Sequence, residues 1–278
     1  TGNPKGVALS HANLLSNIRA MGQVLEASSN DIFVSWLPLY HDMGLIGAWL
    51  GCLYYGAKLV LMSPFTFLSE PSRWLWAVHR HRATLTTAPN FAYELCLKRI
   101  SQEDLEGLDL SSLRACCNGA EPVSASTVSE FGKRFSACGL REDAITPVYG
   151  LAECAVGLTL PGRRRAPILD TIDRNEFQRT GRALPVKEAA KSLAIVACGQ
   201  PLPGHEVRIV DATNREVPER IEGRIQFRGP SATKGYVDNP GENEKLFAGE
   251  WLNTGDLGYR ALGDLYVTGR SKDVVIRA

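Results

Sequence analysis

The sequence lacks the features that would place its main partner in a membrane or on nucleic acid. Its most apolar stretch, residues 44–55, is shorter than the roughly 20 residues that span a bilayer, and we interpret it as part of a buried helix. The 31 lysine and arginine residues are balanced by 30 aspartate and glutamate residues, without a long block of like charge. Proteins that bind nucleic acid or anionic membranes usually carry a basic excess, so neither is expected as the main partner.

The sequence also lacks paired cysteines. Its seven cysteines are an odd number, and none lies in a C-x-x-C pair. We interpret the adjacent Cys116 and Cys117 as small core residues on a strand, not as metal ligands. Together with the lack of a secretory signal, this cysteine usage favours a reducing, cytoplasmic setting.

The chain does contain enough apolar sequence for a large core, and its first half alternates between strands and helices. Apolar residues make up 44% of the 278 residues and charged residues 22%, as in a globular protein. The alternation predicts an α/β fold with a mainly parallel sheet and flanking helices, in which ligands bind beyond the carboxyl ends of the strands. Strands are predicted over residues 32–36, 58–62, 84–87, 113–117 and 145–149, and helices over a segment capped by Ser10, 45–54, a segment starting at Ser69 or Ser72, 91–99 and 124–135.

The pattern changes after about Gly157, and we divide the chain there. Residues 1–157 are the predicted α/β subdomain, residues 158–192 are a polar, arginine-rich insertion or linker, and residues 193–278 are a smaller β-rich subdomain with a distorted, barrel-like form. The run Arg163-Arg164-Arg165 is interpreted as a solvated loop, with a phosphate or partner role as the alternative. Later strands are expected over 193–197, 206–210, 224–227 and 264–268, with turns at 203–204, 238–241 and 262–264.

The first six residues, Thr1-Gly2-Asn3-Pro4-Lys5-Gly6, are typical of a loop that cradles phosphate. Glycine lets the backbone approach a polyanion closely, and lysine supplies a point charge. The segment does not fit the Walker pattern, because its lysine precedes the last glycine and valine follows it. Taken alone, it is either a surface turn or a loop that places backbone amides and Lys5 around the β- and γ-phosphates of a nucleotide.

Two further motifs follow predicted strands, where an α/β sheet binds its ligands. In Asn118-Gly119-Ala120-Glu121, small residues would let a purine lie against the backbone, and the alternative is a plain strand-to-helix turn. In Tyr149-Gly150-Leu151-Ala152-Glu153, the tyrosine can stack on a base and the glutamate can hold Mg²⁺ against phosphate oxygens. The alternative for this motif is a packed aromatic ring and a surface carboxylate.

Three more residues complete the candidate set. Asp256 lies in a predicted glycine turn and can accept hydrogen bonds from both ribose hydroxyls, and Arg270 can donate to the same sugar. Either residue alone would more often be structural. In Leu37-Pro38-Leu39-Tyr40-His41-Asp42-Met43-Gly44, the His-Asp pair offers too few ligands for zinc. We interpret His41 as a gate or orienting group beside an acyl pocket, with a hydrogen-bonded core histidine as the alternative.

Taken together and in this order, the motifs resemble those of the adenylate-forming superfamily, which contains acyl-CoA synthetases, peptide-synthetase adenylation domains and firefly luciferase. The resemblance runs from Thr1 to Ala278. Within the superfamily the chain looks most like a fatty acyl-AMP ligase. Three features favour that branch. The first is the sequence of residues 37–44, and the second is Ala152, where CoA-forming relatives usually have threonine. The third is the long link between Glu153 and Cys198.

The resemblance implies ATP-dependent activation of a fatty acid to an acyl-adenylate, with release of pyrophosphate and later transfer to the phosphopantetheine thiol of an acyl carrier protein. Lys5 and Mg²⁺ held by Glu153 would neutralise the phosphates, and His41 would border the acyl carboxylate, so these three residues are the catalytic candidates. The ATP and AMP contacts implied by the motifs are Thr1, Gly2, Lys5, Gly6, Asn118, Gly119, Ala120, Glu121, Tyr149, Gly150, Ala152, Asp256 and Arg270.

The resemblance also implies that the chain is a central part of a larger protein, an incomplete adenylate-forming large domain. The family's hinge falls at Lys272 and leads to a small domain with a catalytic lysine, so we expect the isolated chain to be inactive or weakly active. In the family, the insertion is thought to hinder the rotation that forms a thioester with CoA; the alternative is a tolerated surface loop. A fatty acyl-CoA synthetase and a non-catalytic adenylate-binding or scaffold protein stay open as other interpretations.

Overall fold

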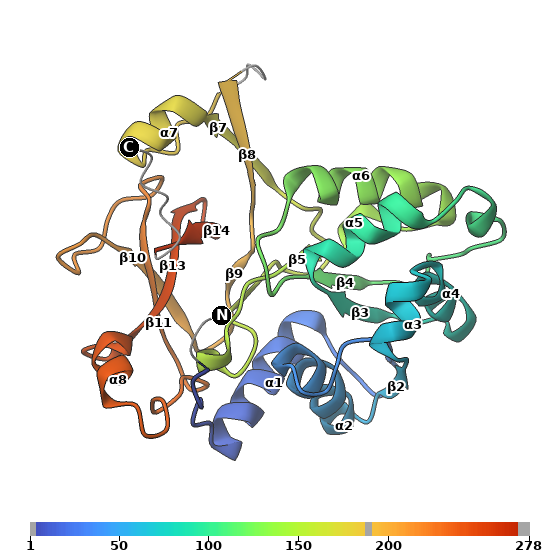
Figure 1. The fold of residues 1–278 in the computed structure, drawn as a ribbon, viewed down its shortest axis with the longest axis horizontal. Helices are drawn as coiled ribbons and strands as arrows, with labels where there is room; N and C mark the ends of the chain where they lie inside the picture. The colour runs from blue at the N-terminus through green and yellow to red at the C-terminus, as the bar shows by residue number, and fades with distance from the viewer. Residues whose placement is uncertain (1–3, 187–190, 272–278) are drawn as a thin grey trace.

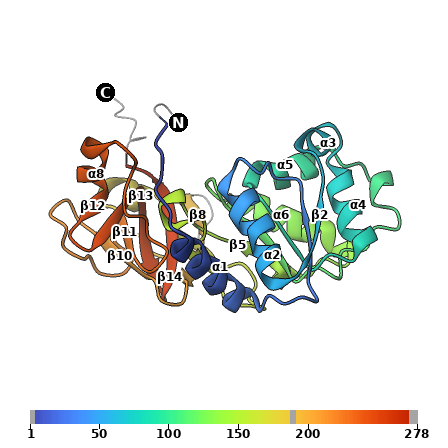
Figure 2. The same ribbon diagram turned by 90° about the horizontal axis from the view of Figure 1, so that it is seen from below.

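The described residues fold around two five-stranded β-sheets and the helices that cover them (Figure 1). The structure, a computed structural model, describes residues 4–186 and 191–271. Figure 2 shows the first sheet with its helices beside the second sheet, with helix α1 (His11–Leu25) running between them. The predicted fold class, a parallel α/β layer followed by a β-rich part, is confirmed.

The first sheet contains the strands β1 (Ile32–Ser35), β2 (Lys58–Leu61), β3 (Leu85–Ala88), β4 (Ala115–Asn118) and β5 (Ile145–Pro147). Its order is β2-β1-β3-β4-β5, and every neighbouring pair is parallel. The central strand β3 is buried at each of its residues, because helices lie on both faces. Since the strands run in one direction, the segments that follow them gather at one edge of the sheet, which we call the carboxyl edge.

Helices cover both faces of the first sheet (Figure 1). On one face, α3 (Pro64–Ser69), α4 (Ser72–His81), α5 (Asn90–Arg99) and α6 (Ala125–Phe135) enclose the largest core, which includes Trp74 and Phe131. On the other face, the π-helix η1 (Met43–Leu50) and α2 (Gly51–Tyr55) pack against Phe33 and Leu85. The 3-10 helices are η2 (Glu103–Leu105), η3 (Ser136–Cys138), η4 (Glu142–Ala144) and η5 (Ala152–Cys154). Among the described residues, no helix has the length and apolar composition needed to cross a membrane.

Two helices differ from their prediction. The residues expected to form one buried helix form η1 followed by α2, and the Leu53 side chain of α2 is exposed. The helix expected to start at Ser69 or Ser72 is α4, which begins at Ser72. Ser69 instead ends α3, a helix that the sequence analysis missed. Pro71 separates the two helices, since it has no N–H with which to continue α3.

The second sheet is antiparallel and contains β10 (Glu206–Val210), β11 (Gly223–Arg228), β12 (Phe247–Ala248), β13 (Trp251–Ala261) and β14 (Asp264–Arg270). Its order is β10-β11-β13-β12, and β14 pairs with β13. Ile225 and Phe227 of β11 face a core that also contains Cys154 and Leu158, from the segment after β5. This shared core joins the second sheet to the segment that leaves the carboxyl edge of the first.

One predicted turn in this part of the chain is only partly correct, because Val237 and Asp238 form a turn but a helix begins at Pro240. Residues 238–241 lead into α8 (Pro240–Leu246), and the Asn239 side chain accepts a hydrogen bond from the N–H of Glu242 at 3.3 Å. Asparagine before a helix and proline in its first turn are both favoured positions, so the residues that resemble a turn also start a helix.

Residues 158–192, predicted as a polar insertion or linker, contain regular elements. β6 (Thr159–Leu160) pairs with β9 (Gln200–Pro201). β7 (Leu169–Asp173) pairs with β8 (Ser192–Val196), and α7 (Arg174–Thr180) lies between these two strands in the chain. The Tyr259 hydroxyl donates to Asp170 at 2.7 Å, and the Phe177 ring lies 6.0 Å from the Tyr259 ring. The segment therefore packs on β13 of the second sheet.

Candidate functional site

The loop that carries Lys5 is held by the second half of the chain. The Val237 N–H donates to Gly6 O at 2.8 Å, and the Ala8 N–H donates to Gly235 O at 3.0 Å. Lys5 forms an ion pair with Glu242 of α8. Figure 2 shows this start of the described chain passing beside the second sheet. Thr1 and Gly2, predicted for the same loop, lie outside the described residues.

Glu153 and Lys5 meet at one tyrosine, Tyr236. The Tyr236 hydroxyl donates to Glu153 Oε1 at 2.5 Å, and Lys5 Nζ lies 4.8 Å from the centroid of the Tyr236 ring. The main chain of Glu153 is fixed as well, because the Thr233 N–H donates to its carbonyl oxygen at 2.8 Å. The structure thus brings together the two residues predicted to face the phosphates, although they lie far apart in the sequence.

A second group joins Tyr149, Asp256 and Arg270. The Tyr149 hydroxyl donates to Asp256 Oδ2 at 2.6 Å, and Arg270 Nε lies 3.6 Å from Asp256 Oδ1. Burial, followed by the neighbouring Asp256 carboxylate, holds the pKa of Tyr149 well above its ordinary value, so the phenol stays protonated and donates. The base-side and ribose-side candidates therefore share one hydrogen-bonded group.

The predicted setting of Asp256, a glycine turn, is wrong. Asp256 lies within β13, whose pairing with β11 is interrupted between Arg224 and Gln226. Gly255 has φ +82° there, and this left-handed conformation lets the strand bulge without turning back. The bulge occurs where β13 passes Tyr149, so the carboxylate is presented from a paired strand.

The motif Asn118–Glu121 divides between two places. Asn118 ends β4 and is buried; its Nδ2 donates to Asn90 Oδ1 at 3.1 Å. Asn118 Oδ1 is buried and has no hydrogen-bond partner among the described residues. Gly119 packs against Val148, next to Tyr149, whereas Glu121 accepts a hydrogen bond from the Phe91 N–H at the start of α5. Asn118 and Gly119 therefore adjoin the Tyr149 side of the site, and Glu121 is tied to α5.

The Tyr149–Glu153 motif depends on Gly150 for its course. A Cβ on Gly150 would lie 1.8 Å from the carbonyl oxygen of Val156, so no other residue fits without moving the backbone. Ala152 opens η5, and its carbonyl oxygen accepts a hydrogen bond from the Ala155 N–H at 3.0 Å. The tight turn after β5 places the Glu153 carboxylate next to the Tyr236 hydroxyl.

His41 lies at the carboxyl edge of β1, apart from these two groups. Its Nδ1 is 2.9 Å from Asp42 Oδ1, and this hydrogen bond raises the pKa of His41 above its ordinary value. Nearly half of the His41 side chain is exposed (48%), so it is not a buried core histidine. Within the described residues, no hydrogen bond or ion pair joins His41 to Lys5, Tyr149 or Glu153. Lys272, the predicted hinge, lies outside the described residues.

Several exposed aromatic side chains lie on the same side of the site as His41, and the sequence analysis missed them. Tyr40 follows β1 and is 92% exposed, Phe65 follows β2 and is 81% exposed, and Phe91 follows β3. Phe91 packs edge-on against the buried ring of Trp36 at 6.0 Å. Half of the carboxyl edge is therefore apolar, and the half at β4 and β5 is polar.

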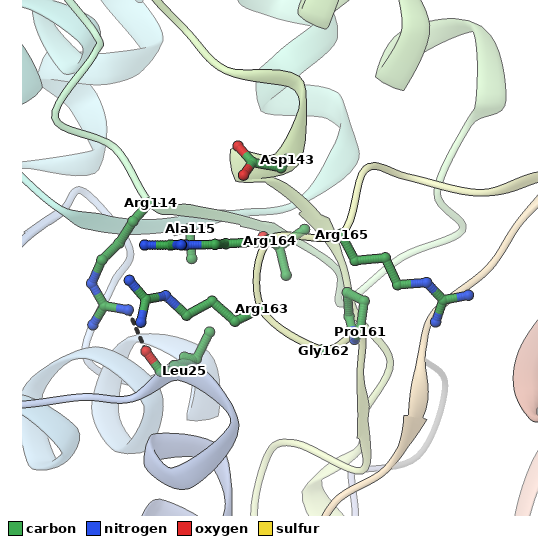
Figure 3. A pocket seen from close by; sticks show the side chains of 10 residues that line it. Leu25, Arg114, Ala115, Asp143, Pro161, Gly162, Arg163, Arg164 and Arg165 are labelled. Carbon is green, nitrogen blue, oxygen red and sulfur yellow. Dashed lines mark hydrogen bonds between the residues drawn. The ribbon is translucent and has the colours of Figure 1, made fainter.

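The run Arg163-Arg164-Arg165 lines a small pocket at the opposite edge of the first sheet, near the start of β4 (Figure 3). Arg163 pairs with Glu26, and Arg165 points away from the other two and binds the buried Asp264 with Nη1 2.8 Å from Oδ1. Arg114, on the other wall, is paired with Asp31. Since carboxylates balance three of these four arginines, the pocket is a structural junction away from the candidate site.

Glu153 fits the way in which proteins bind Mg²⁺ with a nucleotide. Among the described residues, no group of three or more His, Cys, Asp or Glu side chains could hold a metal ion without other ligands. Mg²⁺ usually takes one or two protein carboxylates, and water and substrate phosphates supply the remaining ligands. A single carboxylate near Lys5 therefore suits an ion that arrives with a triphosphate, and does not suit a permanent metal centre.

Comparisons with known proteins agree with this geometry. The profile of the family described as AMP-binding enzyme matches residues 1–237. The chain is 37% identical to the medium-chain-fatty-acid–[acyl-carrier-protein] ligase TtuA of Teredinibacter turnerae, over 99% of this chain and 45% of that protein. It is also 37% identical to the ligase of the same description, JamA, of Moorena producens, over 99% of this chain and 48% of that protein.

A solved structure shares the fold. The fatty acyl-adenylate ligase from L. pneumophila, in complex with acyl adenylate and pyrophosphate, superposes with a TM-score of 0.93 and 39% identity. The alignment covers 98% of this chain and 49% of that one. The chain thus spans about half the length of the relatives it matches.

Proposed function

This chain belongs to the AMP-binding enzyme family, and we propose that it carries the site at which a fatty acid is activated with ATP. The products would be an acyl-adenylate and pyrophosphate. The observation that carries this proposal is the meeting of Lys5 and Glu153 at Tyr236, beside the group formed by Tyr149 and Asp256. One group suits a polyphosphate and the other a nucleoside, and both lie where α/β sheets bind ligands.

In the proposed reaction, a carboxylate oxygen of the fatty acid attacks the α-phosphorus of ATP. The new bond joins that oxygen to phosphorus, the bond from phosphorus to the bridging oxygen breaks, and pyrophosphate leaves with its electrons. The chemistry needs two anions to be held in line and their charge to be offset. We assign Lys5 to the departing phosphates and Glu153 to Mg²⁺, which neutralises phosphate charge when bound.

The nucleoside would lie on the other group. We assign the adenine to Tyr149 and to the segment from Asn118 to Ala120, in which Gly119 packs closely against Val148, so that the base would lie against the backbone. We assign the ribose to Asp256 and Arg270. A bonded tyrosine hydroxyl holds the Asp256 carboxylate in place, so little ordering is needed when the sugar arrives.

The acyl chain would leave the site on the apolar half of the carboxyl edge. His41 follows β1, in this apolar half, and would border the substrate carboxylate. The exposed rings of Tyr40, Phe65 and Phe91 support an apolar substrate, because apolar groups that gather on one surface often mark a binding region. This arrangement favours a fatty acid over a polar acid.

We propose an acyl carrier protein as the acceptor, in preference to CoA. Two relatives, TtuA and JamA, are named as ligases of medium-chain fatty acids and acyl-carrier-protein. Ala152 and the segment of residues 158–186, which packs on β13 through Asp170 and Phe177, also support this choice. The seven cysteines are all free thiols, which supports a reducing, cytoplasmic setting.

Calorimetry with a non-hydrolysable medium-chain acyl-adenylate analogue tests the activation site. We expect the chain to bind the analogue. Asp256→Ala should weaken the binding of ligands that contain the ribose, and Lys5→Ala should weaken the binding of ligands that contain the β- and γ-phosphates. A chain that binds neither the analogue nor ATP would contradict the proposal and favour a scaffold.

The acceptor is tested separately, with acyl-adenylate, holo acyl carrier protein and CoA supplied together to the whole protein. Mass spectrometry would follow the acyl group onto either thiol. Acyl-CoA as the main product would replace our assignment with a fatty acyl-CoA synthetase.

A further inference from the structure

We propose that Tyr236 is a positioning residue for Mg²⁺ binding, which holds one oxygen of Glu153 so that the other oxygen faces the ion. This inference rests on the proposed function, since it gives Glu153 the metal. The Tyr236 hydroxyl donates to Glu153 Oε1 at 2.5 Å, and within the described residues Oε2 has no hydrogen-bond or ion-pair partner. One oxygen is therefore held and the other is left for a ligand.

The position of the Tyr236 side chain is fixed from several directions. Its N–H donates to Asn243 Oδ1 at 2.7 Å, and Asn243 Nδ2 donates back to its carbonyl oxygen at 3.0 Å. Val7 pairs with it on the other side in a β-bridge, and its ring is buried in the core of the second sheet. The hydroxyl thus has a set location before any ligand binds.

The same short segment holds both sides of the phosphate site. The Thr233 N–H donates to Glu153 O, and Thr233 Oγ1 donates to Ala8 O, in the strand-like stretch that follows Lys5. The Tyr236 ring lies beneath Lys5 Nζ. Residues 233–236 therefore set the distance between the Lys5 loop and Glu153. Neither the loop nor the Tyr149–Glu153 motif sets this distance alone.

A fixed donor matters because a free glutamate side chain has several rotamers. Restricting them before the metal arrives lowers the entropy lost on binding. Hydrogen bonds to metal-binding carboxylates typically change metal affinity by about 10-fold to 100-fold.

The test is Tyr236→Phe, which removes the hydroxyl and keeps the ring in the core and beneath Lys5. ATP binding to the chain is measured by calorimetry over a range of Mg²⁺ concentrations. We expect the Mg²⁺ concentration at half-maximal ATP affinity to rise about 10-fold to 100-fold. AMP binding without Mg²⁺ is expected to stay within about twofold, since AMP does not use the ion.

Tyr149→Phe is the matched control, because it removes the same hydroxyl from the other carboxylate, Asp256. It should weaken AMP and ATP alike and leave the Mg²⁺ midpoint in place. If the unaltered chain binds no ATP, the proposed function itself is wrong. If ATP binds and Tyr236→Phe leaves the midpoint unchanged, or weakens AMP as much as ATP, the positioning role is wrong and the proposed function stands.

Discussion

The two halves of the candidate site each contain a carboxylate bonded to a tyrosine hydroxyl, but they use their cations differently. On the nucleoside half, Arg270 lies 3.6 Å from Asp256, so Tyr149 and Arg270 approach different oxygens of one carboxylate. On the phosphate half, Lys5 pairs with Glu242 and not with Glu153. Tyr236 stands between Lys5 and Glu153.

This difference fits what we propose that each half binds. A sugar needs fixed hydrogen-bond acceptors, and a carboxylate with neighbours at both oxygens is a rigid one. A metal ion needs an oxygen free of strong partners, which a direct ion pair with Lys5 would remove. The Lys5–Glu242 pair therefore keeps the cation ordered without using up the carboxylate assigned to the metal.

Glu153→Gln is expected to have the largest effect. The amide keeps the shape of the side chain and loses the charge, so Mg²⁺ loses its protein ligand. At a fixed Mg²⁺ concentration, ATP affinity should fall about 10²-fold to 10³-fold, as when a charge-stabilising group is removed from an active site. Calorimetry with AMP, which should bind within about threefold of the unaltered chain, is the control.

Asp256→Asn is expected to weaken AMP and ATP by the same factor, about 10-fold to 100-fold, at every Mg²⁺ concentration. This range corresponds to the loss of a hydrogen bond to a charged group, about 1.5–3 kcal/mol. Both affinities would be measured by the same titrations as for Glu153→Gln. Should ATP lose more affinity than AMP, the two carboxylates would not have the separate roles we assign.

Gly255→Ala tests the bulge that presents Asp256. The φ of +82° is unfavourable for alanine, and no atom lies within 4 Å of the added Cβ, so the cost is conformational. We expect the free energy of unfolding to fall by about 1–2 kcal/mol in urea denaturation. Gly269→Ala, in the paired strand β14, is the control: it also has open space and its φ is not positive. An equal loss in both variants would contradict the account of the bulge.

Glu242→Gln is expected to have the smallest effect on binding. Freed from Glu242, Lys5 should bind pyrophosphate about twofold to fivefold more tightly, the range for a partly exposed ion pair. Glu244→Gln changes the same charge on the same helix and is the matched control. If pyrophosphate affinity falls in Glu242→Gln, Glu242 helps to bind phosphate through Lys5 and does not compete for it.

The effect of Glu242→Gln on the stability of the fold should depend on pH. Hydrogen bonds from Lys245 and then Lys5 lower the pKa of Glu242 from 4.5 to about 2. A carboxyl group whose pKa is lower in the folded state stabilises the fold fully above pH 4.5, and this contribution is lost as the pH falls toward 2. The difference in urea midpoint between Glu242→Gln and the unaltered chain should be constant from about pH 5 to pH 8 and disappear near pH 2.

Much of the fold was predictable because its signals are local. Ser10 caps α1 as predicted, in a capping box with Asn13, and α6 begins after Ser124, which caps it. The predictions failed where two structures suit the same residues. The Asn-Pro-Gly run of residues 239–241 suits a turn or a helix start, and Gly255 suits a turn or a bulge.

The segment of residues 158–192 contains regular elements for which the sequence analysis made no prediction. Its polar composition indicates a loop, but a few apolar side chains, such as Ile172 and Phe177, are enough to dock it on Tyr259 and Tyr266. Whether so few apolar residues can hold a segment in place depends on the apolar side chains of the surface against which it packs. The spacing of apolar residues within the segment therefore gives little information about where the segment packs.

The amino-acid sequence was sufficient to propose the residues to which we assign the chemistry, because each lies in a motif of a few residues. They are Lys5, Tyr149, Glu153, Asp256 and Arg270. Only the tertiary structure decided their partners. Thr233, Tyr236 and Glu242 have no local pattern that marks them, since they act through contacts with distant parts of the chain. A motif can supply a carboxylate, but which of its oxygens stays free depends on the donors that folding brings beside it.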